Sequence, residues 1–159
     1  MHALHNIEMR ILDPRLHDWG LPRYHSEQAA AWDLHACIDA PLTIAPGDPA
    51  LLVPSGIALL MGESGLAALV LPRSGLGHRR GLVLGNAVGL IDADYSAEIM
   101  ISVWNRNPPG GEVITISPGD RIAQMLFVPV VRPDVNVVGD FTRDTARGAG
   151  GFGSTGVGP

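Results

Sequence analysis

The chain has 159 residues, of which 46% are hydrophobic and 17% are charged, and its formal net charge at pH 7 is −5. This length predicts one domain, and the apolar content is sufficient for a core. The acidic balance excludes a general nucleic-acid binder, which would carry a basic stripe, but it is compatible with a nucleotide site that has a few local cations. The low charged fraction, against about 25% in typical soluble domains, favours subunit interfaces.

Cys37 is the only cysteine, which excludes an intramolecular disulfide and a cysteine-rich zinc site. Its apolar neighbours predict a buried structural thiol. A single cysteine suits a reducing compartment, no signal peptide is recognisable, and no apolar stretch approaches the ~20 residues that span a bilayer. We therefore expect a cytoplasmic protein. The six histidines lack the paired spacing of a metal site, so surface or capping roles are expected for them.

In chain order, short apolar or alternating runs are separated by 20 glycines and 13 prolines, a pattern typical of an all-β sandwich or barrel. The predicted strands are Met9–Leu12, Pro41–Ile44, Leu51–Val53, Ile57–Met61, Leu66–Leu71, Leu82–Leu84, Ile99–Trp104, Glu112–Ile116, Ile122–Val131 and Val135–Val138. Met100–Asn105 and Val113–Ile116 alternate around the loop Arg106–Gly111, which predicts a hairpin. One short helix is expected, with Ser74 as its N-cap and Gly81 after its end.

The segment Pro72–Gly77 ends an apolar strand and opens the expected helix. Free backbone N–H groups at a helix start attract phosphate. Arg73 adds a planar fork of donors, Ser74 adds a hydroxyl, and Gly75 allows a ligand to approach the backbone closely. These features predict a phosphate-binding turn, and the alternative is an ordinary strand-to-helix turn capped by Ser74.

The segment Leu90–Tyr95 is the strongest catalytic candidate. Asp92 and Asp94 share one face of a strand or meet at a tight turn, and one of these carboxylates can act as a general base toward water. Tyr95 can pack against a sugar, and the upstream Asn86 offers both a donor and an acceptor to a base. The alternative interpretation is a hairpin turn without a chemical role.

Two other segments contain isolated polar residues in apolar surroundings. A buried Asp33 would need an ion pair or a metal, and we expect it near magnesium through water, because Mg²⁺ keeps much of its hydration. The alternative is a surface aspartate on an alternating strand. Gln124 can donate to a phosphate oxygen, whereas Asp120 and Arg121 are expected to be structural, as a local ion pair or a subunit contact.

The segment Arg147–Gly156 is rich in glycine. Such a backbone lets N–H groups approach an anion, Arg147 suits phosphate oxygens, and Phe152 offers a face to a flat base. It is not a Walker A loop, because no Gly-Lys-Ser/Thr follows. Composition from about Gly139 onward predicts a mobile arm, and a frayed tail without function is the alternative.

Together and in this order, these segments resemble the five motifs of the trimeric dUTP pyrophosphatase (dUTPase) family, most closely its bacterial members. The matching segments are Ala31–Ala36, Pro72–Gly77, Gly89–Glu98, Gly119–Gln124 and Arg147–Gly156. The resemblance implies an all-β, distorted jelly-roll barrel with one short helix, assembled as a homotrimer with active sites shared between subunits. It implies a barrel over residues 1–138 and an arm over 139–159 that closes over a neighbouring subunit's site.

The resemblance further implies hydrolysis of dUTP to dUMP and pyrophosphate, with Mg²⁺ on the triphosphate, which would keep uracil out of DNA and supply dUMP for thymidylate synthesis. Asp92 would activate the water that attacks the α-phosphorus. Tyr95 would pack under the deoxyribose, Asn86 would bind uracil, and Asp33 would join the water network around magnesium. The other substrate-binding residues of the barrel would be Arg73, Ser74, Gly75, Met100 and Gln124.

In the arm, the resemblance places Phe152 over uracil and Arg147 on the phosphates. The residues near the γ-phosphate would be Gly153, Ser154 and Thr155. The chain departs from the family pattern at Ala97 and Ala31, where glycine is usual or frequent, and at His35, where arginine is frequent.

Two other functions compete with dUTP hydrolysis. A dCTP deaminase shares the fold but lacks the Ile-Asp-x-Asp-Tyr run that is present here at Ile91–Tyr95. A non-catalytic dUTP-sensing regulator is disfavoured because Asp92 and Gln124 are both present. No stable binding of nucleic acid or membrane is expected.

Overall fold

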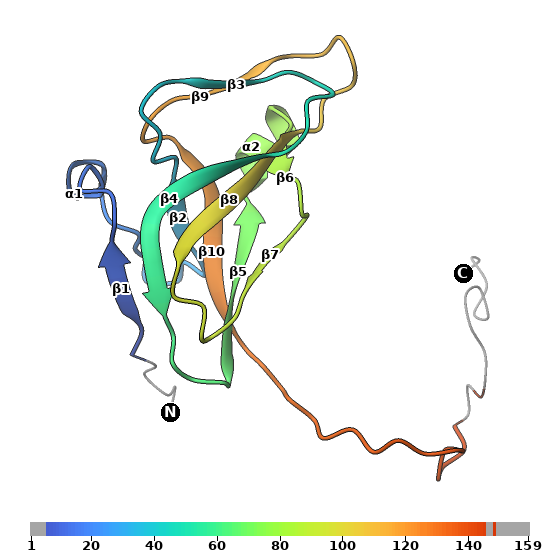
Figure 1. Ribbon diagram of the computed structural model, residues 1–159. Coiled ribbons are helices and arrows are strands. Elements are labelled where there is room, and N and C mark those ends of the chain that lie inside the picture. Colours follow the sequence, from blue (N-terminus) through green and yellow to red (C-terminus); the bar gives the residue numbers. More distant parts are fainter. Residues whose placement is uncertain (1–5, 146–147, 149–159) are drawn as a thin grey trace.

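The computed structural model describes residues 6–145 and residue 148. Two four-stranded antiparallel sheets, β1-β4-β8-β6 and β2-β10-β5-β7, pack against each other, and a two-stranded sheet, β3-β9, lies at one end (Figure 1). The strands are β1 (Glu8–Ile11), β2 (Trp32–His35), β3 (Leu42–Ile44), β4 (Leu51–Leu60), β5 (Leu66–Pro72), β6 (Leu82–Leu84), β7 (Gly89–Ile91), β8 (Glu98–Asn105), β9 (Ile114–Ile116) and β10 (Arg121–Pro129). This architecture confirms the expected all-β jelly roll.

The core forms from side chains that alternate between the two faces of each strand. On β8, Ile99, Ile101 and Val103 are fully buried, whereas Met100 and Trp104 lie on the outer face and are 39% and 40% exposed. Such alternation is the ordinary consequence of the two-residue period of a strand. Cys37 is buried in the same core, and this burial raises the pKa of its thiol to about 12, as expected for a structural cysteine.

The predicted hairpin between Met100–Asn105 and Val113–Ile116 is wrong. Strand β8 pairs with β4 and β6, and β9 pairs with β3. The buried side chain of Asn105, at the end of β8, connects this strand to the ends of the other two segments. Its Nδ2 donates to the carbonyl oxygens of Ile44 and Glu112, both at 2.9 Å. Alternation shows which face of a strand is buried but does not identify the neighbouring strand.

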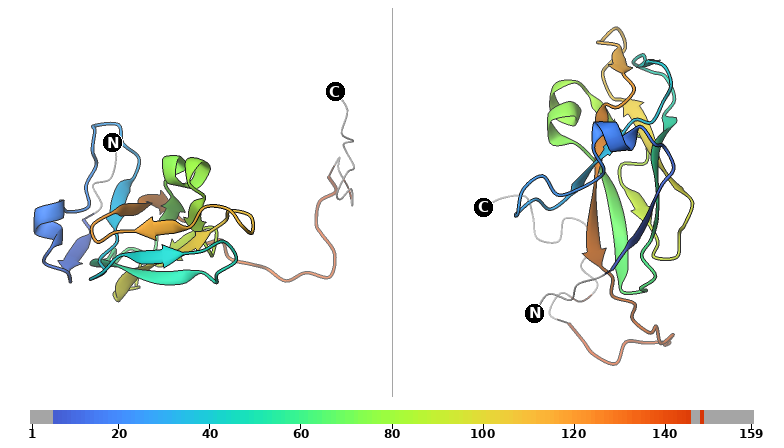
Figure 2. Two further views of the ribbon diagram at one scale, coloured as in Figure 1. Left: turned by 90° about the horizontal axis from the view of Figure 1, so that it is seen from above. Right: turned by 90° about the vertical axis from the view of Figure 1, so that its left-hand side faces the viewer.

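Two other strand predictions need correction. The run Leu51–Val53 and the run Ile57–Met61, apart from its last residue, belong to one strand, β4, which continues through Pro54 with an irregular register before Ala58. No strand forms at Val135–Val138, where Val135 and Val137 are 84% and 91% exposed. The last strand of the barrel ends at Pro129, and the segment from Val130 runs away from the sheets (Figure 2).

Two helices are present among the described residues, one more than expected: α1 (Leu16–Trp19) and α2 (Ser74–Arg79). Helix α1 has four residues, too few to show a helical period. Arg73, not Ser74, is the N-cap residue of α2, and no side-chain hydrogen bond caps this end. Gly81 follows α2 with φ +79°, as its predicted place after the helix requires. No helix in this part of the chain is long and apolar enough to cross a membrane.

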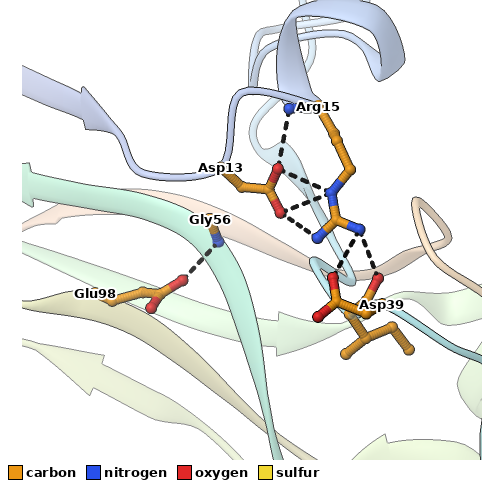
Figure 3. Close-up of polar contacts among 6 residues, drawn as sticks. Asp13, Arg15, Asp39, Gly56 and Glu98 are labelled. Atoms are coloured by element: carbon orange, nitrogen blue, oxygen red, sulfur yellow. Dashed lines mark hydrogen bonds and ion pairs between the residues drawn. The ribbon is translucent and has the colours of Figure 1, made fainter.

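An ion-pair cluster joins the chain after β1 to the segment after β2 (Figure 3). The Arg15 guanidinium donates to both oxygens of Asp13, with the Nη2–Oδ2 distance 2.6 Å, and pairs with Asp39 at 3.1 Å. Nearby, Glu98 accepts the backbone N–H of Gly56 at 3.0 Å. The hydrogen bond from Arg15 holds the pKa of the Asp13 carboxyl below its ordinary value.

The substitution Asp13→Asn should therefore reduce the free energy of unfolding at pH 7 by an amount that shrinks in acid. A lowered pKa in the folded protein stabilises it above the unfolded value of about 3.9, and this contribution is lost as pH falls through the folded value. Urea unfolding at pH 7, 4 and 2.5 measures the difference. Asp39→Asn is the control, since that carboxylate is 97% exposed and its pairing is screened by solvent. A difference that stays constant with pH would contradict the prediction.

Candidate functional site

Five of the candidate residues line one pocket of about 430 Å³: Asp33, Arg73, Ser74, Gly75 and Gln124. The sheet register explains their convergence. Gln124 on β10 lies opposite Leu71 near the end of β5 and opposite Asp33 on β2, and directly opposed residues of antiparallel strands share a face of the sheet. Arg73 and α2 follow the end of β5 immediately. Segments that are distant in the sequence thus meet at one end of the second sheet.

Asp33 forms ion pairs with two arginines in this pocket. Its Oδ1 lies 3.0 Å from Arg73 Nε, and its Oδ2 lies 2.9 Å from Arg121 Nη1. Arg73 Nη1 also donates to the carbonyl oxygen of Arg121 at 2.9 Å. The Asp33 carboxylate is thereby charge-compensated by the protein itself, while the remaining donors of Arg73 stay available to a ligand.

The expected local pair of Asp120 with Arg121 does not form. Asp120 Oδ2 accepts the backbone N–H of Ser117 at 2.8 Å, because this contact closes the turn before β10, whereas Arg121 reaches across to Asp33. Gln124 donates from Nε2 to the carbonyl oxygen of Pro72 at 2.9 Å, which leaves its second amide hydrogen and its Oε1 for other partners.

Asp92 lies at a tight turn, one of the two arrangements expected from the sequence. It follows β7 directly, and its carbonyl oxygen accepts the backbone N–H of Tyr95 at 3.1 Å. The Tyr95 hydroxyl donates to the carbonyl oxygen of Glu98 at 2.9 Å, so that the ring is held beside this turn. Asp92 lines a second pocket, of about 590 Å³, whose walls include Leu60 and Val130. Asn86 and Met100 are exposed.

The two pockets have no lining residue in common. Ile91 pairs with Ala68 near the start of β5, whereas Arg73 follows its end. Asp92 continues β7 to the level of Ala67, six residues before Arg73, and six residues of strand span about 20 Å. A single chain therefore does not bring the Asp92 carboxylate to the pocket that contains Arg73.

His35 is buried, with 6% of its surface exposed, in contrast to the expected surface role. It lies opposite Arg121 on β10, and its ring centroid is 6.5 Å from that of Trp19. Burial, together with the charge of Arg121, lowers the pKa of His35, which favours the neutral ring. No local pattern predicts this burial, because His35 follows the apolar position Leu34 and therefore lies on the same face of the strand as Asp33.

The described residues contain no group of three or more histidine, cysteine, aspartate or glutamate side chains that could hold a metal ion. Both oxygens of Asp33 are engaged by arginines. This donor set suits a magnesium ion that arrives hydrated on a phosphate ligand, with Asp33 reached through water, rather than an ion bound directly by the protein.

Sequence reasoning missed two arginines of the first pocket, Arg79 and Arg80, which lie near the end of α2. Their spacing of four residues from Gly75 and Leu76 could have identified them, since such residues are neighbours on a helix surface. The candidates Arg147, Phe152, Gly153, Ser154 and Thr155 lie outside the described residues.

The substitution Asp33→Asn should lower the free energy of unfolding by about 1 kcal/mol, because it removes the charge shared by two arginines that are themselves partly exposed. In a double-mutant cycle, Arg121→Gln should cost less in the Asp33→Asn background than in the unchanged chain. Urea unfolding of the four proteins at one protein concentration measures this coupling. Strictly additive costs would show that the Asp33–Arg121 contact contributes nothing.

Comparison with known proteins places the chain in a family. A sequence model of the family described as dUTPase matches residues 17–156. The deoxyuridine 5'-triphosphate nucleotidohydrolase of Xanthomonas oryzae pv. oryzae is 55% identical over 153 residues, 96% of each chain.

Two solved phage structures share the fold. A variant of the Staphylococcus bacteriophage 80alpha dUTPase with dUpNHpp has a TM-score of 0.82 at 22% identity, covering 96% of this chain and 99% of its own. A variant of the dUTPase from Staphylococcus aureus phage phi11, described with a structural Mg(II) ion, has a TM-score of 0.74 at 21% identity, covering 87% of this chain and 99% of its own. With the family match over most of its length, the chain belongs to the dUTPase family.

Proposed function

We propose that the protein hydrolyses dUTP to dUMP and pyrophosphate by attack of water on the α-phosphorus, with Mg²⁺ entering as part of the triphosphate substrate. The observation that carries this proposal is the convergence of Arg73, Ser74, Gly75 and Gln124 on one pocket. Family membership supplies the substrate, since curated relatives carry the name deoxyuridine 5'-triphosphate nucleotidohydrolase. Such an enzyme keeps uracil out of DNA and provides dUMP for thymidylate synthesis.

On the phosphate side, the pocket supplies positive charge and oriented donors. Arg73 is held by Asp33 and by the carbonyl oxygen of Arg121, so that its guanidinium is oriented before the ligand binds. Donors that are fixed in advance stabilise developing charge without reorganisation. Gln124 and the Ser74 hydroxyl add uncharged donors at the same pocket, and Asp33 contacts the hydrated magnesium through water in this proposal.

For catalysis, Asp92 is the proposed general base. Its carboxylate is exposed at the turn after β7, where it can accept a proton from water. Because Asp92 lies about 20 Å from Arg73 along β5, the carboxylate that completes the Arg73 pocket must come from another chain. Asn86, Tyr95 and Met100 precede or follow Asp92 in the sequence and are the proposed contacts to uracil and deoxyribose.

A homotrimer with shared sites is the assembly that we propose. Leu52, Met100 and Trp104 share the outer face of the first sheet, since Leu52 pairs with Ser102 between the other two residues, and all three are exposed. Val131, Val135 and Val137 are likewise exposed in the segment after β10. Exposed apolar clusters of this kind mark interfaces. In the proposed assembly, the arm closes over a neighbouring subunit, where Arg147, Phe152, Gly153, Ser154 and Thr155 complete the site.

The competing functions make different demands on the site. A dCTP deaminase must attack the base, whereas the described donors of the first pocket are suited to phosphate. A regulator without catalysis has no need of a carboxylate at position 92. We further propose that the enzyme acts in the cytoplasm, where its single buried thiol stays reduced.

Product analysis tests the proposed function. The purified protein is incubated with Mg²⁺ and dUTP, dCTP, dTTP or UTP, and the expected result is dUMP and pyrophosphate from dUTP alone, lost when EDTA removes the metal. Deoxyuridine products from dCTP would indicate a deaminase. Saturable dUTP binding without turnover would indicate a sensor.

The substitution Asp92→Asn should lower kcat for dUTP by roughly 10²–10⁴-fold, because it removes the base but keeps the size of the side chain. The affinity for a non-hydrolysable dUTP analogue should change little, since the substitution leaves the pocket that contains Arg73 intact. Asp94→Asn is the matched control from the same turn and should retain activity. Wild-type turnover by Asp92→Asn would exclude Asp92 as the base.

A further inference from the structure

Three neighbouring pockets surround the ion pairs of Asp33, and they share lining residues with one another. The charged arginine and aspartate residues that line them are Arg23, Arg73, Arg79, Arg80, Arg121, Asp33 and Asp120. Both aspartates have partners of their own, since Asp33 pairs with arginines and Asp120 accepts the N–H of Ser117. In a chain with a net charge of −5, this region is locally cationic.

Arg79 and Arg80 differ from Arg73 and Arg121 in having side chains without a partner among the described residues. Neither guanidinium group forms a hydrogen bond or an ion pair with another residue of the described chain, and both side chains are exposed. By contrast, Arg73 and Arg121 are held by Asp33. Arg79 and Arg80 line the same pocket as Arg73, and Arg80 also lines the adjoining pocket between α2 and β9. Their charges are therefore available to a ligand that extends beyond Arg73.

Other contacts fix the backbone that carries these two arginines. Arg106 donates from Nε and Nη2 to the carbonyl oxygen of Gly77, at 3.1 and 2.9 Å. Asn107 donates from Nδ2 to the carbonyl oxygen of Arg80 at 3.0 Å. The last turn of α2 is thus attached to the loop after β8, and the two guanidinium groups extend from a fixed base.

A triphosphate places most of its charge beyond the α-phosphorus, in the part that leaves as pyrophosphate. The arginine side chain stays protonated at all working pH values, and its planar guanidinium group can donate two hydrogen bonds to one phosphate group. We propose that Arg79 and Arg80 bind this leaving part of the substrate, and so set the preference of the enzyme for nucleoside triphosphates over diphosphates. The inference rests on the proposed function, because it assigns residues to the phosphate end of the same substrate.

The test uses full-length Arg79→Gln, Arg80→Gln and the double variant. Arg10→Gln is the control, since it makes the same charge change on an exposed residue of β1, far along the sequence from the site. The double variant should lower kcat/KM for dUTP about 100-fold, since charge-assisted hydrogen bonds between arginine and phosphate are stronger than neutral ones. The loss with dUDP should be smaller, and the inhibition constant of pyrophosphate should rise while that of dUMP stays within about twofold.

Repeating the assays at about 0.05 M and 0.5 M salt distinguishes contact from long-range attraction, because salt screens distant charges most strongly. Losses that persist at high salt support direct binding. Losses that disappear at high salt, or that are equal for dUTP and dUDP, overturn the inference while leaving dUTP hydrolysis in place. Wild-type behaviour of the double variant also overturns it. Failure of the unchanged protein to hydrolyse dUTP would instead refute the proposed function.

Discussion

The pairing of β5 with β10 on one side and β7 on the other determines where the candidate residues lie. Through β10, the end of β5 lies beside Gln124 and Asp33. Through β7, the start of β5 lies beside Asp92. Because strand geometry allows little change in length, the phosphate pocket and the proposed base cannot approach each other within one chain. A site that uses both Arg73 and Asp92 therefore requires two chains, as in the proposed assembly.

The Asp33 carboxylate also organises the pocket that contains Arg73, the proposed phosphate site. It engages Arg73 and Arg121 with separate oxygens, so that both guanidinium groups are oriented while their charges are only partly neutralised. His35 is buried opposite Arg121, and its lowered pKa, caused by burial, favours a ring that adds no competing charge at this position. The unpaired Arg79 and Arg80 then extend the positive surface outward. The pocket therefore combines fixed donors near β5 with free charges on α2.

Local sequence patterns predicted those features of the fold that depend on residues close together in the chain. The all-β class, the short helix ending before Gly81, and the buried thiol of Cys37 follow from turn residues and alternation. The partners of β8 did not follow, because β8 and β9 both alternate, and alternation does not show that β8 pairs with β4 and β6 while β9 pairs with β3. The strand expected at Val135–Val138 illustrates the same limit, since its apolar residues find no partner within the described chain.

The candidate site was likewise only partly predictable from the sequence. Motif spacing singled out Arg73, Gln124 and Asp92 as candidates, but the pairing of Asp33 with Arg121 depends on how β2 and β10 are aligned, which no local pattern encodes. Arg79 and Arg80 are spaced by four residues from Gly75 and Leu76, which is compatible with a place beside Arg73, and the structure shows that they line the same pocket.

Subunit complementation tests the shared site most directly. Arg73→Gln and Asp92→Asn variants, each inactive alone, are mixed, unfolded and refolded together, and dUTP hydrolysis is then measured. If Arg73 and Asp92 act from different subunits of a homotrimer, random mixing should give about a quarter of wild-type activity, because that share of sites combines an intact residue of each kind. If the mixture stays as inactive as its components, the two residues do not act across subunits, and the account of the site is wrong.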